Sequence, residues 1–218
     1  GKSSTADITF IPDSSTAGFA SGAFTVTSNG AVADGVETNQ VKAIVTDANG
    51  NVVPGVEVTF SANNSAKVIN SKVMTDGSGA AATTLTSTQV GSSTVTATAN
   101  GKSQNVSVTF VVGAPVVAKS SLSATPMTIQ ADGTTASKLT LTLQDSFGRN
   151  VGGQTVAFVS SLNGSTVGTV KETSTGVYSA DLTTVRSGSS TLSGSGKTTL
   201  IKSIMGMNSG DLEITQGQ

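Results

Sequence analysis

The chain has 218 residues and a formal net charge of −1, with 36% hydrophobic and 11% charged residues, 25 glycines, no cysteine and no histidine. Its few lysines and arginines are scattered, so no nucleic-acid partner is expected, because nucleic-acid binding depends on clustered cations. The lack of cysteine excludes disulfides and thiolate metal sites, and the lack of histidine removes the commonest general base and zinc ligand; we predict no enzyme, no catalytic residue and no cofactor.

Abundant Val and Thr, interrupted by many Gly, indicate an all-β protein with frequent turns, and the length suits two domains. No apolar run is long enough to span a membrane, so the segment is not expected to be membrane-embedded. The first residues do not lead into a signal-peptide core. We therefore expect a piece of a longer mature protein.

Residues 1–20 are predicted to be the closing strand and linker of a preceding repeat. Ala6-Asp7-Ile8-Thr9-Phe10 alternates in the same way as Val106-Ser107-Val108-Thr109-Phe110, the predicted last strand of the first complete repeat. Pro12 follows, and proline interrupts a ladder of strand hydrogen bonds.

Residues 21–116 are predicted to form the first complete domain. Short alternating apolar runs indicate its strands: Phe24/Val26, Val41/Ala43/Val45, Val56/Val58/Phe60, Ala81/Thr83/Leu85, Val95/Ala97/Ala99 and Val106/Val108/Phe110. Turn clusters such as Asn49-Gly50 and Asn100-Gly101 separate the runs. Short strands at regular spacing are typical of a β-sandwich.

Residues 117–207 repeat the pattern and are predicted to be a second domain, followed by a tail or the start of a next segment at 208–218. The turn and strand of residues 47–60 return at 145–158, an offset of 98 residues. Leu182 and Gly188 match Leu85 and Gly91 after a one-residue deletion. Tyr178 stands where the first repeat has Ala81, so we expect the two cores to pack differently.

These motifs together resemble the bacterial immunoglobulin-like repeats of the invasin and intimin family of outer-membrane adhesins. The shared order is Ala-Asp-Gly, a Val/Leu strand, Asp-x-x-Gly-x-x-Val, a strand ending in Phe, then Thr-Asp-Gly-x-Gly-x-Ala, and it covers nearly all of residues 21–193. Thr75-Asp76-Gly77-Ser78-Gly79-Ala80 is intact, whereas Thr173-Ser174-Thr175-Gly176-Val177 departs from the pattern.

The resemblance implies tandem immunoglobulin-like β-sandwiches arranged end to end, in the extracellular part of a Gram-negative cell-surface adhesin. It implies a stalk or adhesion segment, monomeric by itself, whose parent binds a host-cell surface or matrix protein through this segment or another part of the chain. An alternative function is a module that binds protein or carbohydrate through the inter-strand loops 61–75 and 160–173.

Asp47, Asn49 and Asn51 place oxygen atoms at alternate positions, as the start of a calcium loop does. The bidentate Glu of such a loop is missing, and the second repeat has Phe147 and Arg149 in place of the two asparagines. A hairpin turn explains the same residues, and we favour it. Asp34 and Asp132, each followed by Gly, could likewise either bind a metal ion or stabilise a turn, and a turn is again favoured.

The tail at 194–199 looks like a phosphate-binding loop, in which Gly196 lines the phosphates, Lys197 reaches them and Thr198 binds magnesium. However, Thr191 occupies the position of the first glycine, and no partner motifs follow. The repeat offers another interpretation, because 189–193 matches Ser92-Ser93-Thr94-Val95-Thr96 and 199–207 then becomes the last strand. We favour the strand and treat nucleotide binding as a remote alternative.

Overall fold

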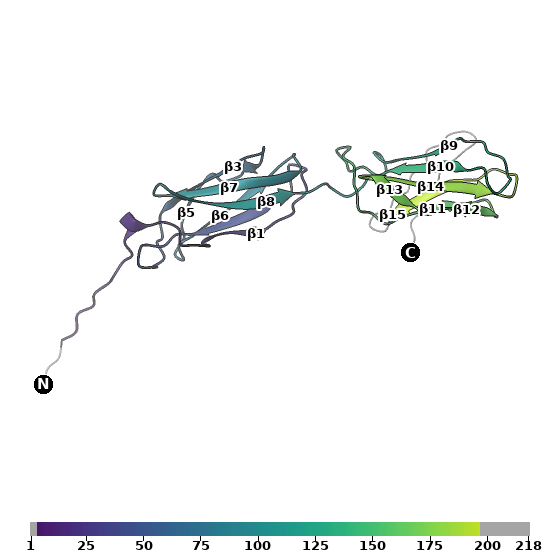
Figure 1. Cartoon of the computed structure of the whole chain (residues 1–218). Coiled ribbons are helices and arrows are strands. Elements are labelled where there is room, and N and C mark those ends of the chain that lie inside the picture. Colours follow the sequence, from purple (N-terminus) through teal and green to yellow (C-terminus); the bar gives the residue numbers. More distant parts are fainter. Residues whose placement is uncertain (1–3, 197–218) are drawn as a thin grey trace. The chain divides into compact units, whose positions relative to one another are not determined.

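The computed structural model describes residues 4–196 (Figure 1). The chain divides into two compact units, Gly1–Val111 and Val112–Gln218. Each unit is built from antiparallel strands and has its own hydrophobic core. The chain thus consists of two tandem immunoglobulin-like domains, and the predicted all-β fold class is confirmed.

The first unit is a sandwich of two four-stranded sheets (Figure 1). One sheet has the order β1 (Phe24–Ser28), β2 (Asn39–Ile44), β6 (Ala80–Thr86), β4 (Lys67–Val68). The other has the order β5 (Lys72–Met74), β3 (Glu57–Ala62), β7 (Gly91–Ala99), β8 (Lys102–Phe110). A short 3-10 helix, Ser14–Thr16, precedes the strands.

Buried and more exposed side chains alternate along the strands, and the buried ones form the core between these sheets. In β2, Val41 and Ala43 are fully buried while the residues between them are half-buried, as expected for a strand with one face on a core. Phe24 of β1 and Phe60 of β3 meet across the layers with ring centroids 6.0 Å apart and tilted by 43°. This tilted contact between apolar rings joins the two sheets.

The second unit repeats the sandwich with a different distribution of strands (Figure 1). The larger sheet has the order β12 (Ser165–Val167), β14 (Val177–Thr184), β10 (Ser137–Thr142), β9 (Ser121–Thr125), and β13 (Lys171–Ser174) also pairs with β14. The smaller sheet consists of β11 (Val156–Ser160) and β15 (Leu192–Gly196).

The strand register is the same in both units. Asn39 pairs with Leu85 in the first, and Ser137 pairs with Leu182 in the second. Across the other sheet, Phe60 faces Ala97 and Phe158 faces Gly194. The offset of 98 residues and the later one-residue deletion, both taken from the sequence, therefore align residues of equivalent structure.

The two units differ in the pairing of one strand, which is β5 in the first unit and β13 in the second. In the first unit Thr75 holds β5 against β3, because its hydroxyl accepts the Val56 N–H (2.9 Å) and donates to the Val53 carbonyl (2.8 Å). In the second unit the hydroxyl of Tyr178 accepts the equivalent N–H, from Gln154 (2.8 Å). In the second unit β13 pairs with β14 instead of β11.

Residues 6–10, predicted to be a closing strand, lie outside any sheet, and Ile8 and Phe10 are 76% and 90% exposed. A strand needs a hydrogen-bonded neighbour, and the described part of this chain gives these residues none. Their assignment to a preceding repeat stays a prediction. Residues 13–20, the end of the segment 1–20 predicted to be closing strand and linker, pack on the first sandwich, where Ala17 is fully buried.

Gly79 lies where the backbone of the first unit is most crowded. It has a φ of +72°, and a Cβ at this position would lie 2.7 Å from the Val45 carbonyl oxygen. Its own carbonyl accepts the Val45 N–H at 2.8 Å. Gly176 has the same φ and the same contact with the equivalent residue, Leu143, so both repeats need glycine here.

We predict that Gly79→Ala destabilises the first unit far more than Gly55→Ala. Both glycines have a φ of +72°, but a Cβ at Gly55 meets no atom within 4 Å. Conformational strain alone costs about 1 to 2 kcal/mol, and the clash at Gly79 should bring the loss to about 3 kcal/mol or more. Calorimetry of the whole chain measures both, and equal losses would show that the close approach is unimportant.

Candidate functional site

The carboxylate of Asp47, in the turn between β2 and β3, accepts four hydrogen bonds. One oxygen, Oδ1, accepts the backbone N–H groups of Asn49 and Asn51, both at 2.9 Å. The other, Oδ2, accepts the Asn51 side-chain amide at 2.9 Å and the Asp13 N–H at 3.2 Å. Asp47 is only 6% exposed, so these donors replace the water that a carboxylate would otherwise bind.

Asp145 makes the same arrangement in the second unit. Its Oδ1 accepts the N–H groups of Phe147 (2.9 Å) and Arg149 (3.0 Å). Its Oδ2 accepts Nε of Arg149 (2.7 Å) and the N–H of Gly113 (3.2 Å). Arg149 also lies over the Phe147 ring, 4.9 Å from its centroid. A guanidinium thus replaces the amide of Asn51, and the fully buried carboxylate gains a charged partner.

The two carboxylates share a role that the sequence did not reveal. Besides closing its own turn, each accepts one N–H from the segment that precedes the first strand of its unit, from Asp13 in one case and Gly113 in the other. We call this arrangement the aspartate clasp. The Asp-x-x-Gly motif predicted the turn, but a hydrogen bond across more than 30 residues leaves no local signal.

The carboxylate oxygens of Asp47, the first residue of the alternative calcium loop, are engaged by hydrogen-bond donors. Asn51 directs its amide nitrogen at Asp47, and backbone N–H groups occupy the other acceptor positions, so a cation would have to displace them. Asp34 and Asp132 likewise accept backbone N–H groups two and three residues ahead. In residues 4–196 no group of three or more acidic side chains gathers in a metal-binding arrangement.

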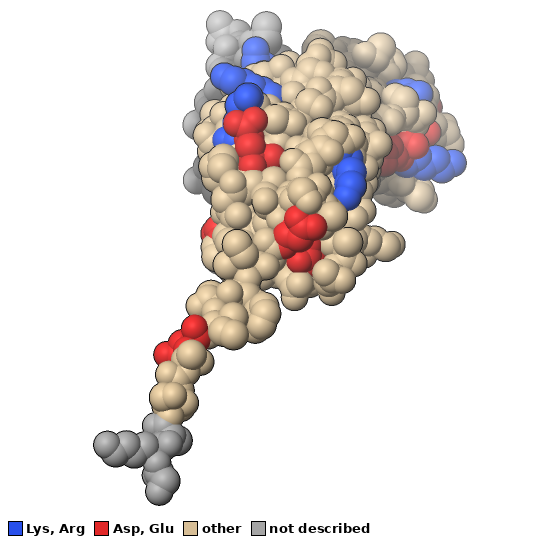
Figure 2. Space-filling model, turned by 90° about the vertical axis from the view of Figure 1, so that its left-hand side faces the viewer, with Lys and Arg blue, Asp and Glu red and all other residues tan. Residues whose placement is uncertain are grey.

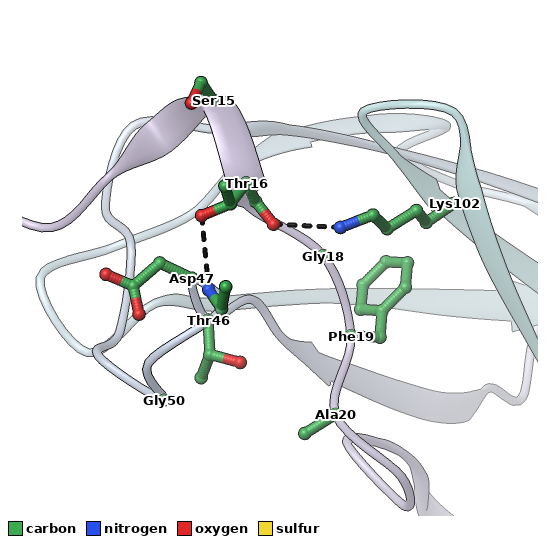
Figure 3. A pocket seen from close by; sticks show the side chains of 10 residues that line it. Ser15, Thr16, Gly18, Phe19, Ala20, Thr46, Asp47, Gly50 and Lys102 are labelled. Carbon is green, nitrogen blue, oxygen red and sulfur yellow. Dashed lines mark hydrogen bonds between the residues drawn. The ribbon is translucent and has the colours of Figure 1, made fainter.

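An open hollow of about 590 Å³ lies beside the clasp of the first unit (Figure 3). Its polar groups hold the arriving segment: Lys102 Nζ donates to the Thr16 carbonyl at 2.9 Å, and Thr16 Oγ1 accepts the Ala48 N–H at 3.2 Å. Gly18 exchanges two backbone hydrogen bonds with Thr46, each of 2.9 Å. The hollow is therefore the junction where residues 13–20 join the sandwich.

Hydrogen bonding lowers the pKa of both clasp aspartates. The amide of Asn51, with help from backbone N–H groups, holds the pKa of Asp47 below its ordinary value although partial burial opposes this. Burial acts most strongly on Asp145 and would raise its pKa, but Arg149 and the backbone N–H groups outweigh it, so this pKa is lowered too.

The remote alternative, a phosphate-binding loop at 194–199, would begin inside a strand. Residues 194–196 belong to β15, and Gly196 faces Val156 of β11. A paired strand directs its N–H groups alternately to two sides, whereas a phosphate loop converges them on one point. Lys197, Thr198 and the predicted last strand 199–207 lie outside the described residues.

The predicted binding loops contain strands. Stretch 61–75 carries β4 and β5, and stretch 160–173 carries β12 and most of β13. Charged side chains are scattered among uncharged ones on the face shown in Figure 2. Within residues 4–196 there is no helix with the length and apolar character needed to cross a membrane.

Two family profiles match most of the chain: the bacterial Ig-like domain (group 1) over residues 21–111 and invasin domain 3 over residues 116–202. Invasin of Yersinia enterocolitica is 37% identical over 115 residues, which are 53% of this chain and 14% of that protein. The inverse autotransporter adhesin YeeJ of Escherichia coli (strain K12) is 33% identical over 152 residues, 69% of this chain and 6% of that protein.

The solved structure of Yersinia pseudotuberculosis InvD is also similar. It has a TM-score of 0.62 and 25% identity, and the match covers 91% of this chain and 59% of that one. The sequence matches thus span only a small part of the two curated relatives, and the structural match supports the tandem arrangement of two sandwich domains.

We predict that Asp145→Asn destabilises the second unit by about 2 kcal/mol or more, because the amide turns one acceptor into a donor and leaves Arg149 without its buried charge partner. Asp181→Asn is the matched control, since Asp181 is exposed in the same unit. Chemical denaturation of both variants measures the difference, and an equal effect would show that the clasp does not stabilise the unit.

We also predict that the protein loses stability in acid. The lowered pKa values of Asp47 and Asp145 mean that the unfolded chain takes up protons first, so the stabilisation is complete above the unfolded pKa of about 4 and is lost as the pH falls through the folded values. Thermal melts from neutral pH down to about 2 test this. A melting temperature that is constant below pH 4 would contradict it.

Proposed function

The chain belongs to the bacterial Ig-like and invasin domain 3 families of adhesin domains, which are not enzymes, and from this we propose that it is a stalk segment of a Gram-negative surface adhesin. The segment lies in the extracellular, surface-exposed part of an outer-membrane protein. It carries a binding module of the parent chain away from the cell, and that module contacts a host-cell surface or matrix protein.

The observation that carries this proposal is the short junction between the units. Val111 is hydrogen-bonded into the first unit, where its N–H donates to the Ala31 carbonyl at 3.0 Å. Gly113 is hydrogen-bonded into the second unit by its aspartate clasp at 3.2 Å. Val112, between them, is partly buried against the core of the second unit. A junction with so few unbonded residues suits a spacer, because a long flexible linker would bring the binding module back toward the cell.

Composition and site chemistry support the same role. Buried polar groups in both units close turns and hold neighbouring segments, and Thr75 and the clasp aspartates are examples. Low charge and many Ser and Thr residues make a solvated surface without a strong electrostatic preference for one partner.

A second candidate function, binding of a protein by the segment itself, is favoured by exposed apolar side chains in stretch 61–75. Ile69 is 48% exposed and Met74 is 56% exposed. A protein partner could cover these exposed apolar side chains.

We expect that replacing this segment, in the full parent protein, by two unrelated Ig-like domains preserves adhesion to host cells, whereas deleting both domains reduces it. The isolated segment should show no saturable binding to the same cells. Saturable binding that is abolished by Ile69→Ser with Met74→Ser, but not by the exposed control Val36→Ser, would favour the binding module and contradict the pure spacer.

A further inference from the structure

Among the described residues, no strand pairs with the edge of β11 away from β15 in the second unit, whereas β5 pairs with the equivalent edge of β3 in the first. There, β5 lies along β3 and the Phe60 N–H donates to the Ser71 carbonyl at 2.8 Å. In the second unit β13 has moved to β14, and no strand of the described residues lies on the side of β11 away from β15. The fold therefore presents a strand edge that its own first repeat shows to be suited to antiparallel pairing.

The backbone groups that face this edge follow from the register. The Ser161 N–H donates to the Thr191 carbonyl at 3.0 Å, so odd-numbered residues of β11 bond toward β15. The N–H and carbonyl groups of Val156, Phe158 and Ser160 consequently point to the open side. Their side chains lie on the core-facing side of the sheet, while Ala157 and Val159 face solvent, and Val159 is 55% exposed.

This edge lacks several of the sequence features that usually keep strand edges apart. From Val156 to Leu162 the sequence contains no charged residue, no proline and no glycine. The corresponding edge strand of the first unit, β5, carries Lys72, which pairs with Glu57 at 3.0 Å. An uncharged strand meets no like-charge repulsion when it pairs with a copy of itself.

Contrary to the monomer that the family resemblance implies, we propose that the β11 edge is a self-association surface, which pairs antiparallel with β11 of a second copy of this chain. The register that uses all five residues places Phe158 opposite Phe158 of the other copy and Val156 opposite Ser160. These are the residues with outward N–H and carbonyl groups, so each such pair exchanges two backbone hydrogen bonds. Ala157 then faces Val159 of the second copy, and the exposed apolar side chains cover each other.

Cysteine pairs test this register, because the natural chain has no cysteine. In a non-hydrogen-bonded antiparallel pair the Cα atoms lie about 4.5 Å apart, which suits a disulfide. Ala157→Cys with Val159→Cys should give a covalent dimer under mild oxidation, linked between 157 and 159 of different copies. Thr59→Cys with Ser61→Cys is the matched control, since β5 covers that edge, and it should stay monomeric.

Sedimentation equilibrium tests the association without cysteines. The natural chain should show a concentration-dependent dimer, and Val159→Lys should weaken it about tenfold or more, because a lysine on an edge opposes pairing. Val185→Lys is the control, since Val185 is 67% exposed outside β11, and it should leave the dimer unchanged. A monomer at every concentration, a dimer insensitive to Val159→Lys, or equal cross-linking of the control pair would overturn the proposal.

Discussion

A buried carboxylate that must be surrounded by N–H donors organises each repeat. Asp47 and Asp145 are nearly inaccessible to water, so the donors that compensate their charge have to come from the protein. The turn supplies two of them and the side chain at the end of the turn supplies a third, Asn51 in one repeat and Arg149 in the other. The last comes from the segment that precedes the first strand of the unit, so the same charge that shapes the turn fixes where the chain enters the sandwich.

This constraint explains why the glycine at the start of the next long strand is equally restricted. The turn that carries the aspartate lies against Gly79 in the first unit and against Gly176 in the second, with backbone atoms about 3 Å from the position of a Cβ. Aspartate, turn and glycine thus form one packed end of the sandwich. Side chains elsewhere in the core vary more freely, as Ala81 and Tyr178 at equivalent positions show.

The exchange of Ala81 for Tyr178 has consequences beyond the core. The tyrosine hydroxyl takes over the N–H that Thr75 accepts in the first unit, and Glu172 accepts the Gly153 N–H, which corresponds to Gly55. With both groups satisfied, β13 is no longer needed beside β11 and joins β14 instead. A change of one core residue is thereby coupled to an open strand edge, the feature on which self-association would depend.

The sequence by itself determined the repeat, the all-β class, the registers of the main strands and the family, because alternation, glycine positions and the offset of 98 residues are local or periodic signals. It also indicated that residues 47–51 form a turn, and the donors around Asp47 agree with that interpretation. Only the tertiary structure decided that the aspartates hold the preceding segment, that residues 13–20 pack on the first sandwich, and which sheet β13 joins. Those outcomes depend on hydrogen bonds between an N–H and an acceptor that are tens of residues apart in the sequence, and a local sequence pattern does not show which acceptor a given N–H will meet.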